Sequence, residues 1–248
     1  MQKGEESMSR TNYSAYVAIK NKILEIFRTE TFEKNKLPSE AALANRLGIS
    51  LVTLRESLMM LALEGYITKR HGSGNYVHPS TLDYENRSYY FTEYIKRKGC
   101  QPSIKLLSQA WQPAEEEDAK ILNLEPGEEV LVNRLMYLAD GNPAVYTVMR
   151  VPAAYLIRRD VEHMSFRYIH VLIRDYMNRD VAHALNEYEP MVVQGELAEI
   201  LQMEEGAAID CSHQVFYDVA DDPVVCNTHY FNPEYYRLRT LQNWDLGR

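Results

Sequence analysis

The stretch Leu37–Val77 constrains this chain most, because it predicts two short helices with a tight turn between them, followed by a β-hairpin. Ser39 is a good N-cap after a proline, and the leucines that follow keep helical spacing. Gly48 breaks this helix at a position where a positive φ is favourable. Ser50 caps the next helix, which ends at Gly65. The pattern therefore predicts a helix-turn-helix.

The hairpin after this pair of helices predicts a basic loop with glycines at its tip. Two short strands, Tyr66–Arg70 and Asn75–His78, flank the tip His71–Gly74. Glycine has no Cβ, so the backbone of such a tip can closely approach a phosphate or enter a minor groove. Lys69 and Arg70 place positive charge beside the tip. A helix-turn-helix followed by this hairpin describes a winged helix.

The start of the second helix predicts contact with a nucleic acid. Thr53, Arg55 and Glu56 face away from the apolar positions of that helix. A helix N-terminus with small polar groups and an arginine suits the floor of a DNA major groove. The pattern also predicts an amphipathic helix at roughly 12–28.

The same stretch resembles the DNA-binding domain of GntR-type bacterial transcription regulators. The matching segments are LPSE at Leu37–Glu40, GIS at Gly48–Ser50, TLRE at Thr53–Glu56, EGYI at Glu64–Ile67 and HGSG at His71–Gly74. The resemblance implies a winged helix-turn-helix at residues 1–78 that binds double-stranded operator DNA.

Two positions depart from the pattern of that family. Many members carry DNA-contacting arginines where this chain has Ala41 and Leu51. Arg55 and the hairpin are then the main inherited contacts. The DNA-binding residues that we expect are Ser39, Ser50, Leu51, Thr53, Arg55, Lys69, Arg70, His71, Gly72 and Gly74.

Charge is distributed unevenly along the chain, whose formal net charge is −8. Residues 1–78 hold 11 Lys and Arg against 8 Asp and Glu, a net charge of +3. The remaining residues hold 16 against 27, a net charge of −11. A basic first part joined to an acidic second part is expected when only the first part contacts DNA.

Other patterns argue against enzymes, metal proteins and membrane proteins. The three cysteines form no CxxC pair, which favours reduced structural thiols, and no histidine pair has the spacing of zinc ligands. No motif of nucleophilic catalysis or nucleotide binding is found. The N-terminus lacks the apolar core of a signal peptide, and no apolar run could span a bilayer. We expect a cytoplasmic protein without cofactor, metal or catalytic residues.

The rest of the chain predicts a second domain of α+β class. A polar linker at 79–87 leads to residues 88–248. Within them, a succession of strand, helix, turn and hairpin occurs twice, with a helical spacer at 165–178 between the copies. Two similar halves that share one mainly antiparallel sheet would explain this repetition.

This layout resembles the UTRA domain of the HutC subfamily of GntR regulators, a fold shared with chorismate lyase. The resemblance rests on FTEYIKRKG, on NLEPGEEVLVNRLMYLADGNPAVY and on the closing hairpin with its aromatic end. It implies a domain that forms homodimers and binds a small polar effector, for example a sugar phosphate.

The resemblance also implies an effector pocket. In members that bind phosphate, the anion lies at the start of the first domain helix, near an arginine on a later strand and a serine that opens the spacer helix. The residues that match, with others that could line the cavity, are Phe91, Thr92, Arg134, Tyr146, Arg150, Ser165 and His229. A helix N-terminus and a guanidinium together bind an oxyanion well. The alternative interpretation makes Thr92 and Ser165 simple N-caps and Arg134 an exposed strand residue.

The leading hypothesis is therefore a homodimeric transcription regulator, of the repressor type, that responds to a small metabolite. Two alternatives stay open. The second domain could retain a lyase-like activity, or the protein could bind DNA without responding to any ligand.

Overall fold

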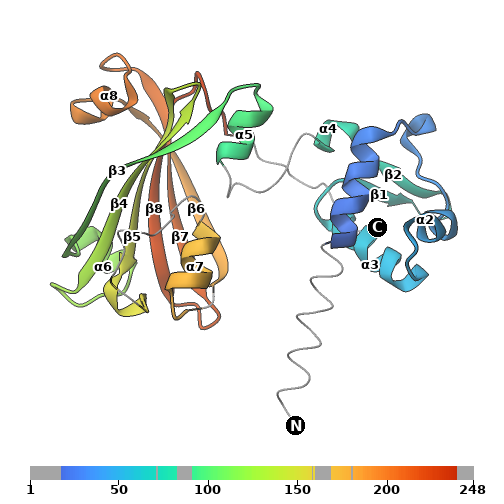
Figure 1. The fold of residues 1–248 in the computed structure, drawn as a ribbon, viewed down its shortest axis with the longest axis horizontal. Coiled ribbons are helices and arrows are strands. Elements are labelled where there is room, and N and C mark those ends of the chain that lie inside the picture. Colours follow the sequence, from blue (N-terminus) through green and yellow to red (C-terminus); the bar gives the residue numbers. More distant parts are fainter. Residues whose placement is uncertain are drawn as a thin grey trace, which may run out of the picture. The chain divides into compact units, whose positions relative to one another are not determined.

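The computed structural model describes residues 18–70, 72–82, 91–157, 159, 169–179 and 181–238. The chain divides into two compact units, the first up to Arg87 and the second Ser88–Leu238 (Figure 1). We call the first unit the head and the second the sheet unit, and we describe each by itself.

The head is a helical core followed by a small hairpin. Its elements are a helix at 18–29, η1 (Glu33–Asn35), α2 (Glu40–Leu47), α3 (Leu51–Leu63), β1 (Ile67–Arg70), β2 (Gly74–Val77) and α4 (Pro79–Leu82). The predicted first helix thus extends one residue further than expected, and its start, 12–17, lies outside the described residues. Residues 79–82, which the sequence placed in a linker, form α4, and Leu82 belongs to the head core.

The predicted caps of the helix-turn-helix are confirmed. Ser39 Oγ accepts a hydrogen bond from the Ala42 amide at 3.2 Å, and Ser50 Oγ accepts one from the Thr53 amide at 3.1 Å. Gly48 lies between the helices with φ +67°, a conformation that glycine adopts without steric cost. These local interactions set the ends of α2 and α3 independently of the rest of the fold.

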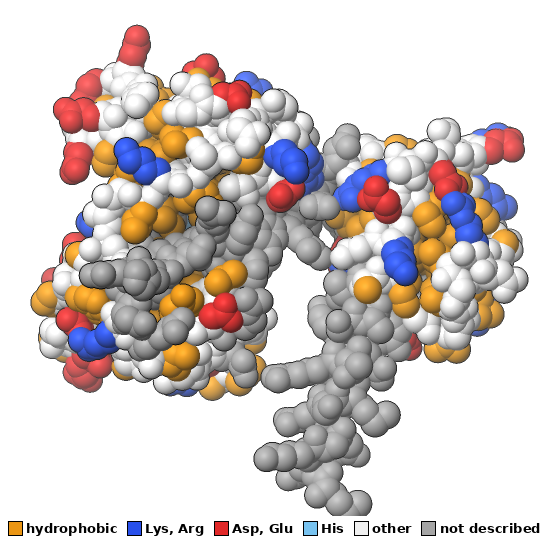
Figure 2. All heavy atoms as spheres, in the orientation of Figure 1, with side chains coloured by type: hydrophobic (Ala, Val, Ile, Leu, Met, Phe, Trp, Pro, Cys, Tyr) orange, Lys and Arg blue, Asp and Glu red, His pale blue; other side chains and the backbone are white. Residues whose placement is uncertain are grey.

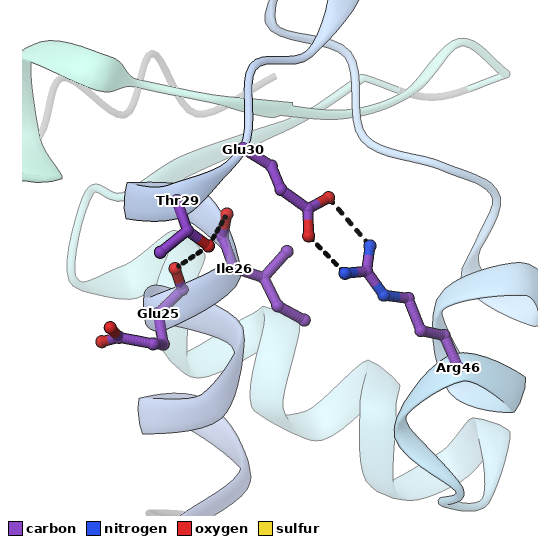
Figure 3. A network of polar contacts seen from close by, with 5 residues as sticks. All are labelled: Glu25, Ile26, Thr29, Glu30 and Arg46. Carbon is purple, nitrogen blue, oxygen red and sulfur yellow. Dashed lines mark hydrogen bonds and ion pairs between the residues drawn. The ribbon is translucent and has the colours of Figure 1, made fainter.

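An arginine–carboxylate pair joins the first helix to α2 (Figure 3). Arg46 donates to both carboxylate oxygens of Glu30, with Nη1 at 2.8 Å from Oε2. This bond holds the pKa of the Glu30 carboxyl below its usual value. On the same helix, Thr29 Oγ1 donates back to the Glu25 carbonyl at 2.8 Å. The pair connects the end of the first helix to the last turn of α2.

One apolar core holds the head together. Its largest fully buried side chains come from three helices and are Ile23, Leu43, Leu54, Leu58 and Leu61. The hairpin adds Ile67 and Val77, which face each other across β1 and β2. The period of the leucines in the sequence therefore corresponds to the packed side of each helix.

The sheet unit contains, within the described residues, one antiparallel sheet of six strands in the order β3-β4-β5-β8-β7-β6. The strands are β3 (Pro102–Pro113), β4 (Glu129–Ala139), β5 (Asn142–Pro152), β6 (Val181–Val192), β7 (Ala208–Asp218) and β8 (Pro223–Phe231). The helices are α5 (Phe91–Arg97), α6 (Glu116–Ile121), α7 (Ile169–Tyr176) and α8 (Glu196–Leu201), with η2 at Ala153–Tyr155.

The sheet confirms the repetition seen in the sequence. One half runs α5-β3-α6-β4-β5 and the other runs α7-β6-α8-β7-β8. The halves meet where β5 pairs with β8, with Met149 opposite Asn227. Each half therefore contributes three strands to a shared sheet, with β3 and β6 at the edges and β5 and β8 at the centre (Figure 1).

Helices cover both faces of this sheet. On one face, α5 packs at one end through Phe91 and Ile95, and α7 packs at the other end through Leu172. We call this the α5/α7 face. On the other, the α6/α8 face, Leu122 and Leu201 pack with α6 and α8 against strand residues such as Val130. Among the described residues, no helix is both long and apolar enough to cross a membrane.

Candidate DNA-binding and effector-binding sites

The N-terminus of α3 presents a small polar cluster. Ser50 Oγ lies 2.7 Å from Thr53 Oγ1, in addition to its capping bond with the Thr53 amide. The carbonyl of Thr53 accepts a hydrogen bond from Ser57 Oγ at 3.0 Å. Ser50 and Thr53 therefore lie together, as the sequence predicted, with their hydroxyls held at the first turn of the helix.

Arg55 is held in place by a carboxylate from the preceding helix. Its Nε donates to Glu40 Oε2 at 2.7 Å, and Glu40 Oε1 accepts from Asn75 Nδ2 at 3.4 Å. The hydrogen bond from Arg55 lowers the pKa of the Glu40 carboxyl. Arg55 stays largely exposed, while Asn75 is buried. This network joins α2, α3 and β2, and neither Glu40 nor Asn75 was among the expected DNA-binding residues.

The same helix start also exposes apolar side chains. Leu51 is 37% exposed and Val52 is 65% exposed, although both are aliphatic. They precede Thr53 and Arg55 in the first turns of α3. This head therefore presents an aliphatic surface at the start of α3.

The hairpin forms the basic loop that the sequence predicted. Lys69 and Arg70 are exposed at the end of β1, and the Arg70 guanidinium lies 4.9 Å from the ring centre of Tyr76. Gly72 and Gly74 have φ of +68° and +114°, which explains glycine at both positions. His71 lies outside the described residues.

The head surface mixes charges of both signs with apolar groups, as Figure 2 shows for one face. The described members of the predicted DNA-binding set lie on α2, α3 and the hairpin, and Glu40 links these three elements. By contrast, acidic side chains gather around α8 on the sheet unit, among them Glu199, Glu204 and Glu205 (Figure 2).

The sheet separates the predicted effector residues into two groups. His229 is opposite Thr147 in the strand register, and the ring of Phe91 lies 5.0 Å from the His229 ring. Phe91, Thr92 and His229 therefore belong to the α5/α7 face or its covering helix. Arg134 is opposite Val148, which packs on the α6/α8 face.

Tyr146 and Arg150 share this second face, because they alternate with Thr147 and Met149 along β5. Arg134, Tyr146 and Arg150 thus cannot line one pocket with Phe91, Thr92 and His229. The expected single pocket is corrected on this point. Ser165 lies outside the described residues.

Arg150 has a structural environment on the α6/α8 face. Its Nε lies 2.7 Å from Asp118 Oδ2, and its Nη1 donates to Thr228 Oγ1 at 3.1 Å. Asp118 is buried, and burial raises the pKa of its carboxyl against the opposing effect of Arg150. The acidic run at 115–118 lies at the start of α6, where negative charge complements the helix dipole. Its last member, Asp118, also binds Arg150 and fastens α6 to the sheet.

A row of amide side chains crosses the α5/α7 face and was missed by the sequence analysis. The cross-strand register places them in line from one edge strand to the other, with Met149 in the middle: Gln109, Asn133, Asn227, Gln214 and Asn186. We call these five residues the amide row. They come from five different strands, so no local motif could have indicated them.

Hydrogen bonds within the amide row leave two buried atoms without a partner. Gln109 Nε2 donates to Asn133 Oδ1 at 2.7 Å, and Asn227 Nδ2 donates to Gln214 Oε1 at 3.0 Å. Gln214 Nε2 in turn donates to Asn186 Oδ1 at 2.8 Å. Among the described atoms, Asn133 Nδ2 and Asn227 Oδ1 find no partner, and neither does the buried Thr92 hydroxyl. Buried polar groups are nearly always hydrogen-bonded, so these three atoms require an explanation.

His229 lies beside this row as a neutral imidazole. Its Nδ1 is 2.9 Å from Thr147 Oγ1, and its Nε2 is 3.3 Å from Gln214 Oε1. Burial lowers the pKa of His229 to about 3, with a smaller contribution from His213. Since the Gln214 oxygen can only accept, the proton lies on Nε2 and the Thr147 hydroxyl donates to Nδ1.

An open cavity of about 350 Å³ lies elsewhere, between the β4–β5 turn, the end of α8 and residues 232–235. Two of its side-chain amides are already paired. Asn142 Nδ2 donates to the Ala139 carbonyl, and Asn232 binds the Pro143 carbonyl and the Glu234 amide. None of the predicted effector residues lines it. Among the described residues, those that line this cavity have no buried polar side-chain atom without a hydrogen-bond partner.

Comparisons with known proteins agree with this two-part architecture. The family model of the UTRA domain matches residues 97–237, more than half of the chain, and the model of bacterial regulatory proteins, gntR family, matches residues 14–77. The chain belongs to the GntR family and carries a UTRA domain. This regulator therefore has a GntR helix-turn-helix head, and its sheet unit is the UTRA domain.

Characterised relatives of this GntR/UTRA regulator are repressors by name. The HTH-type transcriptional repressor NagR of Bacillus subtilis is 28% identical over 175 residues, which cover 70% of this chain and 71% of NagR. The histidine utilization repressor of Pseudomonas putida is 26% identical over 114 residues, or 44% of each chain. These relatives are transcription regulators rather than enzymes.

A solved structure shows the same fold. The crystal structure of the possible transcriptional regulator YydK from Bacillus subtilis has a TM-score of 0.73 at 17% identity, and the match covers 92% of this chain and 99% of that one. The GntR/UTRA protein is thus a DNA-binding transcription regulator with an effector-binding domain.

Proposed function

We propose that this regulator is a repressor whose UTRA domain holds a small, uncharged effector rich in hydroxyl or amide groups. The observation that carries the proposal is the set of three unpartnered buried atoms on the α5/α7 face and its covering helix. Thr92 Oγ1 can donate or accept, Asn133 Nδ2 donates and Asn227 Oδ1 accepts. This combination matches a neutral ligand that both donates and accepts hydrogen bonds.

Charge supports an uncharged effector over a phosphorylated one. Among the described residues, the amide row, Thr147 and His229 on the sheet and Thr92 on α5 include no Lys or Arg, and His229 is neutral. Arg134, the cation expected to bind an anion, and Arg150, which was expected to line the cavity, belong to the other face of the sheet. A phosphate placed here would lack the guanidinium partner that anion sites commonly use.

A thermal-shift screen tests this proposal. The panel contains neutral monosaccharides, polyols and amides on one side, and sugar phosphates with inorganic phosphate on the other. We expect a neutral compound to raise the melting temperature of the wild type, and Asn133→Leu to abolish the shift. The matched control is Arg134→Ala, on the same strand but the opposite face, which should keep it. Stabilisation by phosphate compounds alone, lost in Arg134→Ala, would overturn the proposal.

For the head, we propose that α3 enters the major groove and the hairpin contacts the backbone or the minor groove. Arg55 would bind a guanine or a phosphate, and Thr53 a base edge. Leu51 and Val52 would contact the methyl groups of thymines, because their aliphatic side chains are exposed at the start of α3. The contact surface would be completed by the remaining expected residues, which are Ser39, Ser50, Lys69, Arg70, His71, Gly72 and Gly74.

We further propose that the regulator acts as a homodimer on a pseudo-palindromic operator. Exposed apolar side chains on the two edge strands support this: Leu106 and Leu107 on β3, and Leu185, Tyr188 and Val192 on β6. Edge strands with apolar surface readily pair with a second chain. Sedimentation velocity should give a dimer for the wild type and a shift toward monomer for Leu185→Glu. A monomeric wild type would refute the dimer.

A further inference from the structure

The α6/α8 face contains a cluster of three metal-binding residue types that plays no part in the proposed function. Glu189 on β6 is directly opposite Cys211 on β7, and His213 follows two residues later on the same side of β7. Their ligand atoms all lie within 4.8 Å of one another. Because the amide row belongs to the other face of the sheet, this cluster is separate from the effector site.

The three ligand atoms converge on the imidazole of His213. Its Nε2 lies 3.0 Å from Glu189 Oε1 and 3.7 Å from Cys211 Sγ. In a tetrahedral zinc site with Zn–S of about 2.3 Å and Zn–N or Zn–O of about 2.0–2.1 Å, neighbouring ligand atoms are separated by roughly 3.3–3.6 Å. The two separations that involve His213 are close to these edges, and the third is at most 4.8 Å, so a metal ion could be bound with small side-chain movements.

We propose that Glu189, Cys211 and His213 bind a zinc ion. One sulfur, one nitrogen and one oxygen ligand form a donor set that zinc accepts, whereas magnesium and calcium require oxygen ligands. Three protein ligands leave a fourth position for water or another ligand. The metal would fasten the edge strand β6 to β7.

Binding requires the loss of one proton. Burial and the charge of Glu189 raise the pKa of the Cys211 thiol to about 11, so the thiol is protonated when no metal is bound. On binding, the S–H bond breaks, the proton leaves to solvent, and a zinc–thiolate bond forms. No electron transfer is involved.

The alternative reading is a simple surface pair between His213 and Glu189. The chain offers such a pair for comparison, because Nε2 of His183 on β6 lies 3.2 Å from Oδ1 of Asp221 in the turn between β7 and β8. That pair has no cysteine beside it within the described residues. Cys226 supplies the second comparison. It is buried on β8 and packs on the α6/α8 face without belonging to the cluster.

Cobalt(II) replaces zinc in the test because its thiolate complexes absorb light. The full chain, stripped with a chelator and kept reduced, is titrated with cobalt and then with zinc. We expect a thiolate-to-cobalt charge-transfer band that saturates at about one equivalent per chain and disappears on zinc addition. Cys211→Ser should abolish the band, while Cys226→Ser should keep it.

A second pair of variants separates the site from the surface pair. His213→Gln and Glu189→Gln should each weaken cobalt binding by roughly tenfold or more, since even the loss of a residue that only hydrogen-bonds to a metal ligand costs about 10–100-fold. His183→Gln should leave binding unchanged. Absence of the charge-transfer band in the wild type, or its persistence in Cys211→Ser, overturns the proposal. His213 is partly exposed, so its replacement should not prevent folding. His213→Gln therefore tests metal binding by the cluster even if Cys211→Ser fails to fold.

Discussion

The expected functional residues are arranged differently in the head and in the sheet unit. In the head, the expected contacts lie within one continuous stretch, and Glu40 joins α2, α3 and the hairpin that carry them. In the sheet unit, the expected residues come from distant segments, and the sheet places half of the described ones on each face. A helix-turn-helix surface is thus largely local, whereas a pocket on a sheet depends on strand alternation and register.

The largest expected effect concerns the core that supports the local surface of the head. Leu58→Ala removes a side chain with no exposed area from α3 and should lower the free energy of unfolding by about 2–5 kcal/mol. Met59→Ala is the control, because Met59 follows Leu58 on the same helix and is 55% exposed. Chemical denaturation followed by circular dichroism measures both. Equal losses for the two variants would mean that the packing of α3 differs from that described here.

The pH dependence of stability tests whether His229 is buried as a neutral group in the sheet unit. His229 has a pKa of about 3 in the folded state and about 6.5 when unfolded. The unfolded state therefore binds more protons between these values, and stability is complete above pH 6.5 and lost as the pH falls. By pH 5 the loss from this residue should be about 2 kcal/mol.

Denaturation at several pH values measures this loss, and His229→Gln should flatten the slope between pH 7 and pH 5. His183→Gln, which changes an exposed histidine, should leave the slope as it is. An unchanged slope in His229→Gln would show that the imidazole is not buried as a neutral group.

Replacement of Arg55 tests whether the head binds DNA as its local motif predicts. Arg55→Ala should cost roughly 1–3 kcal/mol of affinity for a duplex selected from a random library by the wild-type protein. Fluorescence anisotropy at fixed salt measures the affinity, since phosphate contacts make it salt-dependent. Lys96→Ala on α5 removes the same charge from the sheet unit and serves as control. Wild-type affinity in Arg55→Ala would rule out the proposed docking.

The aliphatic side chains at the start of α3 offer a smaller and more specific test. Exchanging thymine for uracil in the selected duplex deletes one methyl group, and each contacted position should lose about 0.8 kcal/mol. The double variant Leu51→Ala, Val52→Ala should bind the thymine-containing and the uracil-containing duplex with equal affinity. A full uracil effect in this double variant would assign the methyl contacts to other residues.

The smallest expected effect belongs to the exposed pair of Glu40 and Arg55. Glu40→Gln should change the free energy of unfolding by only about 0–1 kcal/mol, because partly exposed ion pairs contribute little. It should raise the affinity for a scrambled duplex more than for the selected one, since Arg55 is no longer aligned. Anisotropy with both duplexes measures the ratio. An unchanged ratio would remove Glu40 from any positioning role.

Much of the molecule was predictable from short-range patterns. Ser39, Gly48 and Ser50 indicated the ends of α2 and α3, because caps and positive φ act on neighbouring residues. The two halves of the sheet were predictable because the same succession of elements recurs in the chain. The fold class α+β followed from these elements alone.

Side-chain orientation across the strands was not predictable in the same way. Arg134 was expected beside Thr92, yet a shift of one residue along a strand moves a side chain to the other face. Register shifts in the β3–β4, β4–β5, β6–β7 and β7–β8 pairings make such counting from a motif unreliable. The Glu189–Cys211–His213 cluster escaped the search for metal motifs for a related reason, since Glu189 is close to the others only through strand pairing.

By itself, the sequence determined the helix-turn-helix, its glycine-tipped hairpin and the repeated α+β layout, because each rests on interactions between residues that are near one another along the chain. Only the tertiary structure decided that Arg55 binds Glu40, that Arg150 binds Asp118 and that five amides align across one face. These contacts join residues far apart in the sequence, and register and packing select them among many alternatives that the sequence permits equally.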